Sequence, residues 1–161
     1  APPLPYSLSS LQIDANKIFG ISSKQCLDYC QSLYEKHKLI TYPRSDSRHL
    51  PQEQFYQAEH VISAVANNDS RKLQACADAD PTIKSKAWND NKVDAHHAII
   101  PSSAKRDITA LSQPERNIYH LICQQYLLQF YPSYEYAETK VEIEIEKGLF
   151  KTSARQTLNL G

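Results

Sequence analysis

The sequence contains no methionine, only 3 glycines, and no long uninterrupted run of apolar residues. A membrane-spanning helix needs about 20 consecutive, mostly apolar residues, so the chain is not expected to cross a membrane. The opening Ala1-Pro2-Pro3 also lacks the basic and apolar regions of a signal peptide. Because methionine is missing even from the first position, we expect the chain to be an excised fragment of a longer protein.

An excess of charge of either sign is also missing, because 18 Lys and Arg residues balance 18 Asp and Glu residues. Dedicated nucleic-acid-binding domains are usually basic, so this balance counts against that class. A chain can nevertheless be neutral overall while one groove is positive, and DNA binding therefore stays open. With 161 residues, of which 41% are hydrophobic, the chain suits one domain, or one domain and part of another.

The 4 cysteines form no Cys-x-x-Cys pair, the spacing that is typical of zinc and redox motifs. Two of them stand four residues apart and would share one face of a helix. The pattern predicts small, buried, reduced thiols in a cytoplasmic protein. The residues concerned are Cys26, Cys30, Cys76 and Cys123.

Most of the chain shows the apolar spacing of amphipathic helices. Ser9 or Ser10 could cap the first helix, and Gly20 stands where that helix would end. The expected helices lie at about 10–19, 22–37, 52–66, 70–78 and 112–130. The apolar side of the first is predicted to contain Leu11, Ala15, Ile18 and Phe19.

Residues 79–110 are the least regular stretch, and a loop of this length is usually functional. Three aromatic residues in or after it could stack on nucleic-acid bases, namely Trp88, Tyr119 and Tyr126. Tyr119 and Tyr126, however, occupy helical positions that are more typical of a core.

The pattern changes at residues 139–146, where apolar and charged residues alternate strictly, as in a half-exposed strand. Lys147-Gly148 would form a turn, and residues 149–153 would pair back as a hairpin. The many glutamates of this segment have the wrong sign for contact with a DNA backbone, which indicates a scaffold. The predicted fold class is therefore mainly α with a small β portion.

Residues 39–51, Leu-Ile-Thr-Tyr-Pro-Arg-Ser-Asp-Ser-Arg-His-Leu-Pro, carry the most distinctive chemistry. Pro43 favours an extended backbone at Tyr42, and residues two apart in an extended run share a face. A phenol at Tyr42 beside a guanidinium at Arg44 suits attack on a phosphodiester. Phenols hold their proton at neutral pH, so nearby positive charge or a metal would have to help. The alternative is a proline-containing turn with a half-buried tyrosine and solvated arginines.

The run from Ile40 to Arg48 resembles the active-site tyrosine signature of type IA DNA topoisomerases, and the proline after the tyrosine resembles their topoisomerase III branch. Residues 4–12, Leu-Pro-Tyr-Ser-Leu-Ser-Ser-Leu-Gln, resemble the segment that leads into the tyrosine-bearing domain of that family. Residues 94–101, Asp-Ala-His-His-Ala-Ile-Ile-Pro, resemble its histidine motif. Three matches in the family's order make this a specific resemblance, although residues 102–161 add no sharp motif.

The resemblance implies a helical tyrosine-bearing domain at residues 9–131. Residues 1–8 would then end a β-rich arch domain or form a hinge, and residues 132–161 would return to that arch domain as a β-hairpin. In this family the tyrosine domain is inserted in the arch domain and swings away to open a gate.

The resemblance also implies roles for single residues. Tyr42 would attack single-stranded DNA and keep the 5′-phosphate as a covalent ester, after which the 3′-hydroxyl reverses the reaction. Arg44 would hold the scissile phosphate, and His96 would lie near a DNA phosphate. Further DNA contacts are expected from Ser45, Asp46, Arg48 and His97. Asp46 could instead fix Arg44 or cap the next element, Arg48 could meet only solvent, and the His96-His97 pair lacks a third ligand for a metal site.

Magnesium is the cofactor that the resemblance implies, bound by an acidic cluster in a separate N-terminal domain that this chain lacks. The expected partners are single-stranded DNA and that metal-binding domain of the same protein, in the cytoplasm and associated with the nucleoid. The chain alone would then carry half of an active site and would not cleave DNA. The alternatives are a non-enzymatic helical module that binds single-stranded DNA and a plain scaffold or interaction domain.

Overall fold

The computed structural model describes residues 1–133, 135–145 and 148–159. The chain divides into two compact units, a helical unit at Pro3–Tyr131 and a second unit that contains a β-hairpin. The α-helices are α1 (Leu8–Phe19), α2 (Ser23–Gln31), α3 (Gln52–Phe55), α4 (Ala58–Asn68), α5 (Leu73–Asp78) and α6 (Gln113–Leu127). Single helical turns of other types are the π-helix η1 (Ser32–Lys36) and the 3₁₀ turns η2 (Ser70–Lys72), η3 (Asp90–Lys92), η4 (Ile108–Ala110) and η5 (Leu128–Phe130).

Helix α1 begins earlier than predicted, because Ser7 rather than Ser9 or Ser10 is its N-cap. The Ser7 side chain accepts from the backbone of Ser10, whose hydroxyl closes a capping box. The predicted end is confirmed, since Gly20 adopts φ 68°, a left-handed conformation that suits glycine. The prediction that Ile18 faces the core is wrong, because that side chain is 57% exposed.

The predicted helix 22–37 is an α-helix only as far as Gln31. From there Ser32–Lys36 continue as the π-helix η1, in which the N–H of His37 donates to the carbonyl of Ser32 at 3.1 Å. The predicted helix 52–66 is likewise two helices, α3 and α4. The shorter helix, α3, is bonded to the loop that follows residue 87. The N–H of Gln52 donates to Asp90, and the Gln52 side chain donates to the carbonyl of Trp88.

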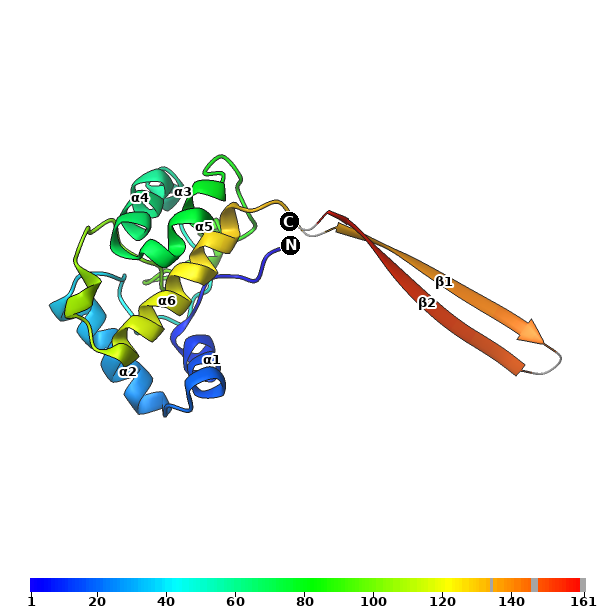
Figure 1. Cartoon of the computed structure of the whole chain (residues 1–161), viewed down its shortest axis with the longest axis horizontal. Helices are drawn as coiled ribbons and strands as arrows, with labels where there is room; N and C mark the ends of the chain where they lie inside the picture. The colour runs from blue at the N-terminus through cyan, green and yellow to red at the C-terminus, as the bar shows by residue number, and fades with distance from the viewer. Residues whose placement is uncertain (134, 146–147, 160–161) are drawn as a thin grey trace. The chain divides into compact units, whose positions relative to one another are not determined.

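The core of the helical unit gathers on α6, which runs from the end of the unit that holds α2 toward the end that holds α5 (Figure 1). Its capping box at Ser112 and Glu115 is confirmed. Tyr119 and Tyr126 are buried in this core, and so is Trp88, which packs against Phe130 with ring centroids 5.3 Å apart. These three aromatic residues therefore offer no face to a DNA base.

All the cysteines are buried and carry free thiols, as predicted. The buried polar residue Asn68 closes a hydrogen-bond network, since its side chain bonds to Tyr119 and to the backbone of Ala104 and Arg106. Among the helices that the structure describes, none is long and apolar enough to cross a membrane.

The hairpin consists of β1 (Glu135–Ile145) and β2 (Gly148–Asn159), paired antiparallel. The register runs from Ile145 opposite Gly148 to Tyr136 opposite Thr157, with an irregularity between Glu135 and Tyr136. Both strands are longer than predicted, and Lys147 of the predicted turn lies outside the described residues. With six α-helices and this hairpin among the described residues, the predicted fold class, mainly α with a small β portion, is confirmed.

Candidate active site

The loop that carries Tyr42 is irregular, with bends at Thr41 and at Pro43, so the extended run predicted through Tyr42 is interrupted there. Burial alternates along it, because Pro43 and Ser45 are buried whereas Arg44 and Asp46 are exposed and Tyr42 is half-buried. Beyond the bend at Pro43, this alternation is typical of a backbone whose side chains point to opposite sides in turn. The loop therefore presents its tyrosine, its first arginine and its aspartate on the outer side.

The histidine motif is hydrogen-bonded to this loop on both sides of Tyr42. The N–H of Thr41 donates to the carbonyl of Ile100 at 3.0 Å, and the N–H of Ile100 donates to the Thr41 hydroxyl at 3.0 Å. Beyond the tyrosine, the N–H of Ala98 donates to the carbonyl of His49 at 2.9 Å. Residues 94–101 thus lie directly alongside the tyrosine loop.

The N-terminal segment joins the same cluster. The N–H of Leu8 donates to the carbonyl of Ser45 at 2.9 Å, and the N–H of Ile99 donates to the carbonyl of Tyr6 at 2.8 Å. Tyr6 is buried, and its hydroxyl donates to Asp14 at 2.8 Å. Three stretches that are separate in the sequence therefore meet at one place in the helical unit.

The Tyr42 side chain lies between two other aromatic rings. The imidazole of His96 stacks on it, with ring centroids 4.3 Å apart and an interplanar angle of 25°. Tyr34, from the π-helix, meets it edge to face at 5.7 Å and 84°. Tyr42 therefore contacts rings from both the histidine motif and the π-helix.

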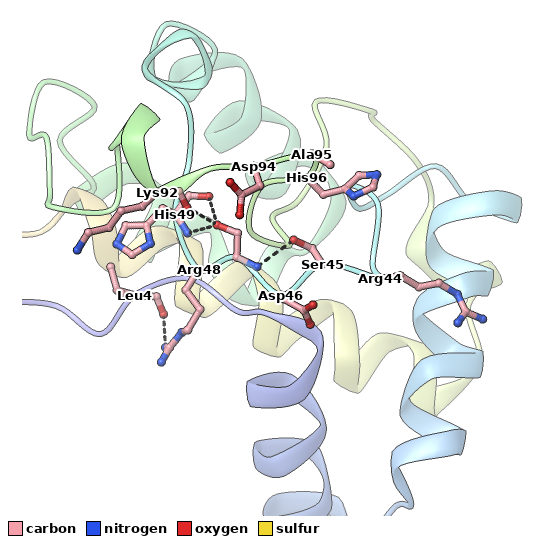
Figure 2. A pocket seen from close by; sticks show the side chains of 11 residues that line it. Leu4, Arg44, Ser45, Asp46, Arg48, His49, Lys92, Asp94, Ala95 and His96 are labelled. Atoms are coloured by element: carbon pink, nitrogen blue, oxygen red, sulfur yellow. Dashed lines mark hydrogen bonds between the residues drawn. The ribbon is translucent and has the colours of Figure 1, made fainter.

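Arg44 leaves its guanidinium available to a ligand. Within the described part of the chain, its side chain makes no hydrogen bond, ion pair or cation–π contact, and it is exposed. Figure 2 shows it directed away from the other labelled side chains. The carboxylate of Asp46 is likewise unpaired among these residues and does not fix Arg44, which was one of the roles considered for it.

A pocket of 490 Å³ opens beside this cluster (Figure 2). In the view of Figure 2, Arg44 and His96 lie at one side of it and His49 and Lys92 at the other, with Asp46 and Asp94 between them. Its lining comprises Leu4, Arg44, Ser45, Asp46, Ser47, Arg48, His49, Lys92, Asp94, Ala95 and His96. Five of the seven residues expected to act on DNA therefore line this pocket, whereas Tyr42 and His97 are not among its lining residues.

Three of the expected DNA contacts, Arg48, His97 and Ser45, are engaged within the protein. Arg48 donates from Nε to the carbonyl of Pro5 at 2.9 Å and from Nη2 to the carbonyl of Leu4 at 2.7 Å. His97 does not line the pocket, and its Nδ1 lies 2.8 Å from the carbonyl of Ala98. Ser45 lines the pocket but is 2% exposed, and its hydroxyl accepts from the N–H of Ser47.

Sequence reasoning did not single out His49 and Lys92, although His49 belongs to the tyrosine loop. Burial lowers the pKa of His49, and the nearby charges of Lys92, Arg48 and Lys86 lower it further. Lys92 and Arg48 thus bring positive charge to this part of the lining, which also contains the carboxylates of Asp46 and Asp94. Lys92 lies in an irregular stretch that gives no local signal of its place.

The residues described here offer no assembled site for a metal ion. No group of three or more His, Cys, Asp or Glu side chains among them gathers closely enough to hold one. Asp46 and Asp94 are the carboxylates of the pocket, and they stand without a third such ligand.

The chain belongs to the DNA topoisomerase family. The family model described as "DNA topoisomerase" matches residues 1–161, which is the whole chain.

Among its curated relatives, the chain is 57% identical to DNA topoisomerase 3 of Vibrio cholerae over all of its length, and 50% identical to that of Pasteurella multocida over 95%. The resemblance to the topoisomerase III branch is thereby confirmed. The matches cover 25% and 23% of those relatives, so the chain spans about a quarter of their length.

A solved structure, full-length topoisomerase I of Thermotoga maritima, shares the fold. It superimposes with a TM-score of 0.65 over 98% of this chain and 26% of that protein, at 23% sequence identity.

Proposed function

We propose that the full-length protein containing this chain is a type IA DNA topoisomerase that cleaves one DNA strand transiently, passes another strand and rejoins the break. The observation that carries the proposal is the meeting of three segments, 4–12, 39–51 and 94–101, around Tyr42. The family membership of the chain supports it independently.

The proposed step is a transesterification at phosphorus. The Tyr42 oxygen forms a bond to the phosphorus of a phosphodiester, the bond from phosphorus to the 3′-oxygen breaks, and a 5′-phosphotyrosyl ester results. The phenol gives up its proton, and the departing 3′-oxygen takes one up. The reverse attack by the 3′-hydroxyl restores both the strand and the tyrosine, so rejoining needs no other energy source.

The side chains around Tyr42 are suited to this step. The free guanidinium of Arg44 can hold the scissile phosphate with two parallel N–H donors and stabilise the charge that develops on it. His96 keeps the phenol in place by stacking and can donate to the same phosphate. Ser45, Asp46 and Arg48 shape the adjoining wall of the pocket.

Magnesium and its ligands are proposed to lie in another domain of the full-length protein, because the residues described here do not assemble a site for the ion. On this view the chain by itself binds single-stranded DNA at most weakly and does not cleave it. We expect the full-length protein to work in the cytoplasm, on nucleoid DNA.

The test uses the full-length protein, Mg²⁺ and a single-stranded oligonucleotide labelled at its 3′ end. After denaturation, the label should migrate with the protein, and Tyr42→Phe should abolish this adduct. Tyr131→Phe is the matched control and should keep the adduct. It removes a tyrosine hydroxyl that donates to the carbonyl of Ala75, far from Tyr42 in the sequence. Binding of the strand without any adduct would instead favour the non-enzymatic DNA-binding module.

A further inference from the structure

The segment that leads into the tyrosine loop departs from regular helix geometry at one place. The π-helix Ser32–Lys36 follows α2 directly, and the N–H of Leu39 donates to the carbonyl of Leu33, six residues back, at 2.9 Å. Isolated π-turns are rare and occur frequently at functional sites. Because a π-turn holds one residue more than an α-turn, it changes the direction in which the following side chains leave the helix.

The residue after this turn is also unusual. Lys38 has φ 58°, the only positive φ among the described residues other than glycine. Such a conformation is costly for a side-chain-bearing residue and persists only where the surroundings fix it. Here Ser102 fixes it, since its hydroxyl donates to the carbonyl of Lys38 at 2.6 Å and its N–H donates to the carbonyl of Leu39 at 2.8 Å.

The first residue of the π-helix is also bonded to α6 through a carboxylate, and the residue that follows the π-helix lies near the same carboxylate without a hydrogen bond to it. The hydroxyl of Ser32 donates to Glu115 at 2.6 Å, and Nε2 of His37 lies 3.7 Å from the other oxygen of Glu115. These ties come from a residue 83 positions away from Ser32. The tertiary structure therefore holds the irregular turn in place.

The consequence of this geometry is the placement of Tyr34. Its ring meets the Tyr42 ring edge to face at 5.7 Å, and Nζ of Lys38 lies 5.9 Å from the centre of the Tyr34 ring. Edge-to-face pairs at this separation are favourable. Together with the His96 stack, the contact restricts the Tyr42 ring from two directions.

We propose that Tyr34 is a positioning residue for Tyr42, held against it by the π-helix, and that its ring sets the direction from which the phenol oxygen meets the phosphate. This inference rests on the proposed function. It assigns to Tyr34 no contact with DNA and no proton transfer. Its effect should therefore fall on the rate of the chemical step and leave the affinity for the strand unchanged.

The experiment measures single-turnover formation of the covalent adduct by the full-length protein at saturating, 3′-labelled single-stranded oligonucleotide with Mg²⁺. Tyr34→Leu should slow adduct formation by about 10- to 100-fold, the scale expected for a misdirected nucleophile. Tyr34→Phe keeps the ring and should stay within about threefold of the unmodified protein. Tyr29→Leu is the matched control, because Tyr29 is a half-buried tyrosine of the preceding α2 and packs on the same core without touching Tyr42.

Affinity is measured separately for each variant in a Tyr42→Phe background, where no cleavage interferes, and should not change. A Tyr34→Leu protein that forms the adduct as fast as the Tyr29→Leu control would overturn the proposal. So would equal losses in Tyr34→Phe and Tyr34→Leu, since the hydroxyl rather than the ring would then matter.

Thermal unfolding of each variant separates positioning from folding. Tyr34→Met provides a second non-aromatic replacement, and loss of the native transition in both non-aromatic variants would make Tyr34 a folding residue and overturn the proposal. If the unmodified protein forms no adduct at all, the failure lies with the proposed function and not with Tyr34.

Discussion

The helical unit and the hairpin of this chain differ in where they keep their apolar side chains. Every fully buried apolar side chain among the described residues belongs to the helical unit. In the hairpin, by contrast, Ile143, Leu149 and Phe150 are between 49% and 62% exposed. The helical unit therefore has a core of its own, whereas the described strands of the hairpin have none.

This difference indicates how each unit is stabilised. A two-stranded hairpin is marginally stable at best when its faces are open, and its strands are held here by their ladder and by ion pairs such as Glu142 with Lys151 at 2.8 Å. In the helical unit, burial stabilises the fold and also holds the tyrosine loop. Substitutions of matched residues in the two units should therefore change the free energy of unfolding by different amounts.

The largest contrast is expected between two phenylalanines. Phe130 is fully buried against Trp88 and Tyr126, so Phe130→Ala should lower the free energy of unfolding by roughly 3–5 kcal/mol. Phe150 is 62% exposed, and Phe150→Ala should change the free energy of unfolding by less than about 0.5 kcal/mol. Urea unfolding of the chain, followed by its helical circular dichroism, measures both. Similar losses would show that the hairpin shares a core after all.

A smaller loss is expected from a buried polar group of the helical unit. Asn68→Ala leaves the N–H of Arg106 and the carbonyl of Ala104 without their partner, which should cost about 1–3 kcal/mol. Asn67 is its exposed neighbour on α4, and among the described residues the Asn67 side chain bonds only to Asn68, so Asn67→Ala should cost less than about 0.5 kcal/mol. The same unfolding experiment compares the pair, and equal effects would contradict the role of the network.

The stability of the helical unit at acid pH should depend on the carboxylate of Glu115. Burial alone would raise the pKa of Glu115, but hydrogen bonds from Ser32 and Ser112 outweigh it and hold that pKa below its ordinary value. The stability that Glu115 supplies is therefore present above the unfolded pKa, about 4.3, and is lost as pH falls through the lower folded pKa. Unfolding measured between neutral pH and pH 3 should show this loss, and Glu115→Gln should make the curve flatter there.

The smallest effect is expected in the hairpin. Glu142 and Lys151 stand directly opposite each other but are exposed, so Glu142→Gln should change the free energy of unfolding by less than about 0.5 kcal/mol. Any such effect should shrink further in high salt, because salt screens exposed charges. Unfolding at two salt concentrations measures it, and a salt-insensitive loss of more than about 1 kcal/mol would mean that the pair is shielded from water.

The sequence predicted those features that depend on local signals. The capping box at Ser112 and Glu115 located α6, and Gly20 located the end of α1, because both are short-range hydrogen-bonding patterns. The three stretches that resemble one family also lie together around Tyr42. The extended run predicted from Pro43 is interrupted, because the backbone bends at Thr41 and at Pro43.

The remaining features depend on distant residues and could not be predicted from local patterns. The π-helix begins at Ser32, which is bonded to the distant Glu115, and the break between α3 and α4 accompanies the attachment of Gln52 to Asp90. Arg48 was expected at DNA, yet its guanidinium finds the carbonyls of Leu4 and Pro5, more than forty residues away. The spacing of residues within the loop does not indicate such distant partners.

The attachment of the tyrosine loop to two other segments has a mechanical consequence. In the proposed function, a DNA strand joined covalently to Tyr42 would pull on this loop whenever the strand is under tension. The loop is anchored on one side at Thr41 and on the other at Ser45 and His49. A force on Tyr42 would act on these hydrogen bonds at the same time and would be distributed over the helical unit. The bonds would therefore not break one after another.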